Sequence, residues 1–216
     1  MKETIRFFLQ MVLFLCASYG RLEAAVVINE FLADPPAGLV GDANRDGVRS
    51  ASDDEFVELI NAGGSPMNLS SWSLWDSLSL RHRFPDGTAL APLQRLVVFG
   101  GGNPAGFTGL VQTASTGSLS LNNGSDRIFL RDSADAVADQ LAYLSEADRD
   151  QSLTRFPEGS GIFTLHTLIS ARPFSPGGPA GGSETGRTPV PEPITAALVG
   201  AGLLCLINKR SVDRAG

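Results

Sequence analysis

The central part of this chain contains neither cysteine nor lysine. Cys16 and Cys205, like Lys2 and Lys209, lie near the two ends, so residues 26–190 can form no disulfide and no thiolate metal site. The same residues carry 11 Arg against 19 Asp plus Glu, a net charge of −8. An acidic surface of this kind repels the phosphates of nucleic acids, so a nucleic-acid partner is disfavoured.

Groupings of catalytic side chains are scarce as well. The two histidines, His82 and His166, are far apart, and the chain has no Gly-x-Ser-x-Gly or His-Glu-x-x-His motif. The glycine-rich stretch 100–104 is followed by no helical pattern, so we interpret it as a turn. We therefore expect no enzyme. The alternative is a secreted hydrolase that uses carboxylates or a metal on glycans or phosphodiesters, because spatial pairing of acidic residues is invisible in a sequence.

No long stretch of the chain has apolar residues at helical spacing. Short apolar runs separated by Gly, Pro, Asn and Asp predict an all-β fold, an antiparallel β-sandwich. Tight turns are expected at the Asn-Gly of residues 121–126 and at residues 131–136. We expect strands at 25–32, 55–61, 69–76, 95–100, 117–121, 126–132, 136–143, 151–157 and 163–169.

The composition changes at Pro173 to a Pro/Gly/Ser stretch that has no recognisable core residues. Such a composition is typical of a linker. We assign residues 26–179 to the domain and residues 180–189 to a linker that spaces the domain from the C-terminal segment.

The first 25 residues have the layout of a secretory signal peptide. A basic start with Lys2 and Arg6 precedes an apolar stretch from Phe7 to about Ala17, and small residues come after it. The apolar stretch is short for a membrane span. We therefore expect residues 1–25 to direct export.

The C-terminal residues 190–210 carry three features in order: a Val-Pro-Glu-Pro element, an apolar run at 194–207, and a basic pair. A helix of that run is about 21 Å long, which is marginal for a hydrocarbon core of about 30 Å. The pattern resembles the PEP-CTERM sorting signal of bacterial envelope proteins. That resemblance implies a transmembrane helix and an exosortase-type partner in the inner membrane; a plain C-terminal anchor is the alternative. The matching residues are Val190, Pro191, Glu192, Pro193, Lys209 and Arg210.

An acidic stretch, residues 42–55, precedes the run Phe-Val-Glu-Leu-Ile-Asn. Its oxygen-bearing residues fall at loop positions one, three, five, nine and twelve, with Gly47 at position six. This spacing resembles the calcium loops of EF-hand and dockerin proteins, although no helices flank it and the last position has Asp instead of Glu. Asp54 or Glu55 could substitute there, and a solvated turn is the alternative. We expect a structural Ca²⁺ on Asp42, Asn44, Asp46, the carbonyl of Val48, Ser50 and Asp53.

Several strand-like runs together resemble a known family. Ile-Asn-Glu at 28–30, the block at 55–61, the Trp-containing run at 69–76, Arg-Leu-Val-Val-Phe-Gly-Gly at 95–101 and Phe-Ser-Pro-Gly-Gly-Pro at 174–179 are similar to bacterial lamin-tail domains. The resemblance covers most of residues 26–179. It implies an immunoglobulin-like β-sandwich that serves as a binding or structural module.

The two tryptophans lie three residues apart, so on a strand they point to opposite faces. We expect Trp72 in the core. Trp75 would cover a sheet face or bind a ligand such as a carbohydrate.

Together these features predict an exported, calcium-stabilised β-sandwich module that is sorted to the bacterial cell envelope or extracellular matrix. The expected partners are the sorting protease and an envelope protein or polysaccharide. Before processing, the C-terminal helix would hold the chain in the membrane.

Overall fold

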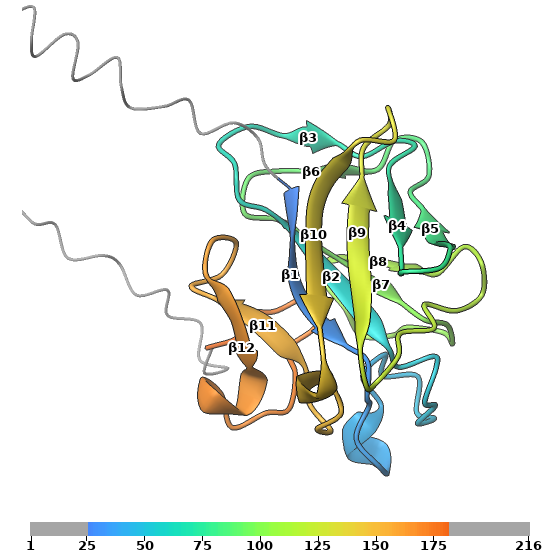
Figure 1. Cartoon of the computed structure of the whole chain (residues 1–216), viewed down its shortest axis with the longest axis vertical. Helices are drawn as coiled ribbons and strands as arrows, with labels where there is room; N and C mark the ends of the chain where they lie inside the picture. The colour runs from blue at the N-terminus through green and yellow to red at the C-terminus, as the bar shows by residue number, and fades with distance from the viewer. Residues whose placement is uncertain (1–25, 182–216) are drawn as a thin grey trace, which may run out of the picture. The chain divides into compact units, whose positions relative to one another are not determined.

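Two β-sheets dominate residues 26–181, the part of the chain that the computed structural model describes (Figure 1). The larger sheet has the order β12-β11-β1-β2-β7-β8, and the smaller has the order β10-β9-β4-β5. The larger consists of β1 (Val26–Leu32), β2 (Phe56–Asn61), β7 (Arg95–Phe99), β8 (Leu110–Thr113), β11 (Leu153–Phe156) and β12 (Ile162–Leu165). The smaller consists of β4 (Ser73–Trp75), β5 (Leu80–Arg83), β9 (Asp126–Arg131) and β10 (Val137–Tyr143). A ribbon of β3 (Met67–Asn68) and β6 (Ala89–Leu90), and the 3₁₀ helices η1 (Leu39–Gly41), η2 (Ser145–Ala147) and η3 (His166–Leu168), complete the fold.

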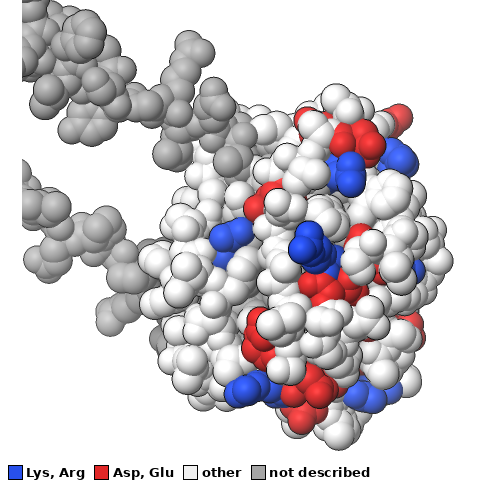
Figure 2. All heavy atoms as spheres, viewed as in Figure 1, with Lys and Arg blue, Asp and Glu red and all other residues white. Residues whose placement is uncertain are grey.

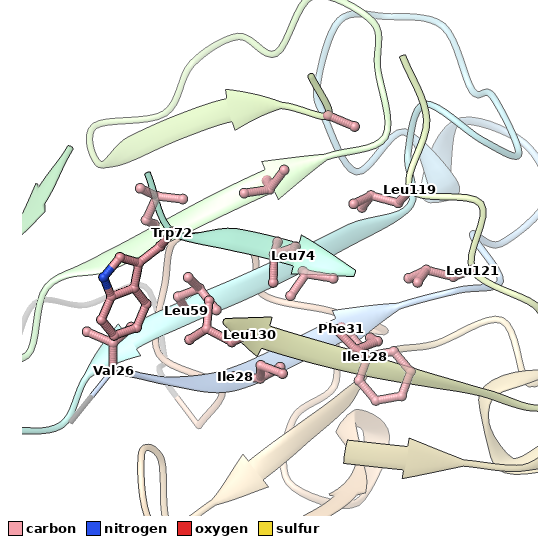
Figure 3. Packing of buried hydrophobic residues seen from close by; sticks show 14 of the residues in the cluster. Val26, Ile28, Phe31, Leu59, Trp72, Leu74, Leu119, Leu121, Ile128 and Leu130 are labelled. Atoms are coloured by element: carbon pink, nitrogen blue, oxygen red, sulfur yellow. The ribbon is translucent and has the colours of Figure 1, made fainter. Parts of the chain in front are cut away.

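The main core lies between the two sheets (Figure 3). Because strand side chains alternate between faces, Ile28, Leu59 and Leu96 stand in register on the inner face of the larger sheet. The smaller sheet contributes Leu74 and its neighbours on β9 to the same core. Trp72 belongs to this cluster, as the sequence predicts.

Four sequence expectations differ from the structure. The strands β3, β6 and β8 fall in none of the nine expected ranges. Strands β7 and β8 are parallel, whereas a purely antiparallel sandwich is expected. The connection 100–109 passes over the outer face of the sheet, and such a crossover is what a parallel pair needs. Residues 117–121 form no strand, although two of their leucines are buried, and residues 166–168 form η3 instead of continuing β12.

A second, smaller core lies on the outer face of the larger sheet. Leu32, Phe56 and Phe99 stand in register across β1, β2 and β7, and all three are buried. Phe107 and Phe174 cover them. The expectation that the stretch from Pro173 contains no core residues is therefore wrong for its described part.

Residues 172–181, which we call the C-terminal strap, are fastened to two buried carboxylates. Glu30 on β1 and Glu58 on β2 are directly opposite each other and have no exposed surface. The backbone N–H and hydroxyl of Ser175 donate to Glu30 at 2.8 and 2.7 Å. The N–H of Gly177 donates to Glu58 at 2.8 Å. The strap thus supplies the hydrogen bonds that a buried carboxylate requires.

His166 connects the strap to Glu30. Its Nδ1 lies 2.8 Å from the carbonyl of Arg172 and must donate, because a carbonyl carries no proton. Its Nε2 lies 2.9 Å from the Ser175 hydroxyl.

Burial raises the pKa of the Glu58 carboxyl well above its ordinary value, and neighbouring Glu30 raises it further.

Removing the strap alone should unfold or strongly destabilise the domain. A chain ending at Ile169 keeps every strand but leaves Glu30 and Glu58 without the strap's donors. We expect its free energy of unfolding, measured by urea denaturation, to fall by about 3 kcal/mol or more relative to a chain ending at Gly181. Equal midpoints for the two chains would contradict this assignment.

The carboxylate pair also predicts a pH dependence of stability. Because the pKa of Glu58 is raised in the folded state, folding retains a proton that the unfolded chain releases above about pH 4.5. The contribution of this group is present at low pH and is lost as pH rises through its folded pKa. Glu58→Gln should flatten the decline of melting temperature with pH, whereas Glu146→Gln, at a half-exposed position, should leave it unchanged. Parallel pH profiles for wild type and Glu58→Gln would refute the assignment.

Candidate functional site

The acidic loop, residues 42–54, runs from η1 to β2 and turns its first three oxygen-bearing side chains onto its own backbone. The Asp42 carboxylate accepts from the N–H groups of Asp46 and Gly47 at 3.2 and 2.9 Å. The side-chain oxygen of Asn44 also accepts from the N–H of Asp46, and the Asp46 carboxylate accepts from the N–H of Val48. Gly47 has φ of 90°, a conformation that favours glycine. The loop is therefore tightly wound.

Asp54 closes the loop from its other end. Its two carboxylate oxygens accept from the N–H groups of Asn44 and Ser50 at 3.0 and 2.7 Å, and the residue is fully buried. Burial raises the pKa of Asp54, and the nearby Asp42 charge also raises it. The side chain of Glu55 instead accepts from the N–H of Leu121, and burial raises its pKa to about 8. Asp54 thus belongs to the loop and Glu55 belongs to the interior.

The glycine-rich stretch 100–103 supports the acidic loop from the neighbouring connection. The N–H of Asn103 donates to Asp46 at 3.1 Å, which contributes most to lowering the pKa of Asp46. A Cβ on Gly102 would lie 2.5 Å from Asp46 Oδ2, and one on Gly101 would lie 2.5 Å from Asp53 Oδ1. This stretch is a turn, as expected, and its glycines also admit the carboxylates.

All six predicted metal ligands lie in this loop, but its carboxylates do not converge on one point. Ser50 Oγ accepts from the N–H of Asp53. Within residues 26–181, no group of three or more His, Cys, Asp or Glu side chains is placed to hold a metal ion. The donor atoms are nevertheless all oxygens, which suits a hard cation such as Ca²⁺. The donor atoms are therefore of the type that calcium prefers, although the carboxylates of the described loop are not gathered around one point.

Trp75 lies on the outer face of the smaller sheet and is half-buried. Its indole N–H donates to the Ser73 hydroxyl at 3.0 Å, and the guanidinium of Arg131 lies 5.4 Å from its ring centroid. The two tryptophans therefore occupy opposite faces, as the spacing predicts.

The sequence singled out Glu30 and Glu58 only as part of a family resemblance and did not indicate what they hold. Their partners Ser175 and Gly177 lie more than a hundred residues further along the chain. The available signal was the pair of glutamates within otherwise apolar strands, because a buried carboxylate needs donors from elsewhere. His166 is fully buried, so it serves the strap and has no contact with solvent.

The predicted export and sorting segments lie outside the described residues. This applies to residues 1–25 and to the motif from Val190 to Arg210. Among residues 26–181, no helix has the length and apolar character needed to cross a membrane.

Comparison with known proteins places the fold in a family. The model of the lamin tail domain matches residues 22–145, which is more than half of the chain. Comparison with curated proteins gives no match. The match contains β1 to β10, including Glu30, Glu58 and the whole acidic loop. The chain therefore belongs to the lamin tail domain family, whose members are non-catalytic immunoglobulin-like domains.

Proposed function

We propose that this protein is an exported, calcium-stabilised binding or structural module of the bacterial cell envelope or extracellular matrix. The observation that carries the proposal is the family assignment, since the lamin tail domain is a non-catalytic, immunoglobulin-like module. The signal-peptide pattern and the PEP-CTERM pattern support export and sorting by an exosortase-type protease. The partner of the mature module would be an envelope protein or a polysaccharide.

Calcium would act here as a structural cation. Asp42, Asn44 and Asp46 would hold it through side-chain oxygens, and Asp54 would share the last position with Asp53. The cation would offset the repulsion between the negative charges of Asp42 and Asp54, which raises the pKa of Asp54. Because the loop leads directly into β2, the bound cation would fix the start of that strand.

Calcium should bind the folded protein and stabilise it. Calorimetric titration should give about one Ca²⁺ per chain, with a rise in melting temperature, because a cation bound only by the folded form shifts the unfolding equilibrium. Asp42→Asn should abolish or strongly weaken both effects. Asp86→Asn removes the same charge from an exposed position outside the loop and should change neither. If the wild type shows no heat of calcium binding and no rise in melting temperature, the loop is a solvated turn and the calcium proposal is wrong.

The sorting signal requires a separate test in cells. Replacing Pro191, Glu192 and Pro193 by alanine should leave the precursor unprocessed and retained in the inner-membrane fraction. The paired change Thr188→Ala and Pro189→Ala, just before the motif, should not alter processing. Fractionation and immunoblotting read out size and location. If the motif variant keeps the size and location of the wild type, the segment is a plain anchor.

A further inference from the structure

The two sheets of the sandwich differ in width, and the difference leaves part of the larger sheet uncovered. At one end the smaller sheet lies against β1, where the N–H of Ile28 donates to Asp139 of β10 at 2.8 Å. At the other end it lies against β8, where the side chain of Gln112 is 2.7 Å from His82 of β5. The smaller sheet therefore covers β1, β2, β7 and β8, and β11 and β12 lie beyond its edge (Figure 1).

Arg155 of β11 fills one part of this uncovered region. Its guanidinium donates to the carbonyl of Ile28 at 2.7 Å and to Asp139 at 3.2 Å, and it lies 4.6 Å from the ring centroid of Phe163. Beyond this contact, towards the end of β10, a recess of about 380 Å³ remains between β10 and β12. The recess lies where a further strand of the smaller sheet would run.

The wall of the recess is largely apolar. It contains four leucines and the rings of Phe31, Tyr143 and Phe163, and one of the leucines, Leu168, is 72% exposed. In the view of Figure 2, the surface over β11 and β12 is mostly uncharged. The volume lies within the range of ligand pockets, and such a wall suits an apolar side chain.

The free edge of β10 borders the recess. Alternate residues of an edge strand turn their N–H and C=O groups away from the neighbouring strand. Gln140 is one of these residues, because its N–H donates at 2.8 Å to the Asp139 carboxylate, which lies on the side of β1. Ala142, two residues further on, therefore also faces the free edge, and it lines the recess. An added peptide strand can bond to such backbone groups, whereas an acyl chain cannot.

The charge at the recess is negative. Glu146 follows β10 in η2 and lines the recess, and none of the ion pairs within residues 26–181 involves it. The net charge of −8 on residues 26–190 adds to the attraction for a cationic group. Charge complementarity thus favours an occupant that carries Lys or Arg beside its apolar side chain.

We infer that an extended basic segment of a partner protein adds to the free edge of β10 as a fifth strand of the smaller sheet. The inference rests on the proposed binding function and names a protein segment, in place of a polysaccharide, as the ligand. The backbone of the segment bonds to Ala142, an apolar side chain fills the recess, and a basic side chain pairs with Glu146. The added strand covers β11 and β12 as β10 covers β1.

Titration of the full chain with a short synthetic peptide tests this inference. The peptide has leucine at alternate positions, with threonine and lysine between them. One control peptide has serine in place of the leucines, and a second has glutamate in place of the lysines. We expect saturable binding of the leucine–lysine peptide only, measured by fluorescence anisotropy.

Substitutions in the chain locate the binding. Leu168→Lys places a cation at the recess and Ala142→Pro removes the N–H at the edge, so each should weaken binding about tenfold or more. Glu146→Gln should weaken it about threefold, because an exposed ion pair contributes little. Leu78→Lys makes the same change at an exposed position between β4 and β5 and should bind like the wild type. Thermal unfolding of Leu168→Lys should be unchanged, since the side chain is exposed.

Four results would overturn the inference. Absence of peptide binding in a protein that still binds calcium and reaches the envelope would overturn it and leave the proposed function intact. Equal binding of the serine–lysine peptide would reduce the effect to net charge. Binding that survives both Leu168→Lys and Ala142→Pro would place the peptide elsewhere on the domain. A dimer of the free chain that Leu168→Lys dissociates would assign the recess to a second copy.

Discussion

Two carboxylates placed side by side inside a sheet constrain the whole domain. Glu30 and Glu58 oppose each other across β1 and β2 without exposed surface, a costly arrangement unless donors surround them. The donors come from Asn29, Ser152, Ser175 and Gly177. The carboxylates on β1 and β2 therefore have all their hydrogen-bond donors only when the C-terminal strap is packed against the sheet. This dependence extends beyond residue 145, where the family match ends.

The strap belongs to an outer layer that turns a two-sheet sandwich into a three-layer structure. Phe174 of the strap, Phe107 of the β7–β8 connection and Ala43 of the acidic loop meet over the second core. The layer has little regular structure, so side-chain and backbone hydrogen bonds hold it in place. A cation in the acidic loop would stabilise this layer, and the core between the sheets would depend on it less directly.

The strands with alternating side chains could be predicted from the sequence because their pattern reflects two faces of different polarity. The segment 117–121 shows where this reasoning fails. Leu119 and Leu121 alternate inward like strand residues, but the polar groups between them bond locally: the Ser120 N–H donates to the Ser118 hydroxyl. The composition of the strap predicts a linker because its donors are largely backbone N–H groups, which composition does not reveal. In the acidic loop, the oxygen spacing is visible in the sequence, but the return of the Asp54 carboxylate to the N–H groups of Asn44 and Ser50 depends on the path of the backbone, which the spacing does not show.

The close approach of the acidic loop to Gly101 and Gly102 links two segments that lie almost fifty residues apart in sequence. Any side chain at these glycines would collide with the carboxylates of Asp46 and Asp53. The two segments therefore have to fit each other sterically. A protein engineer who grafts the acidic loop onto another sandwich would have to transplant the glycine stretch with it, and natural recombination between related domains faces the same restriction.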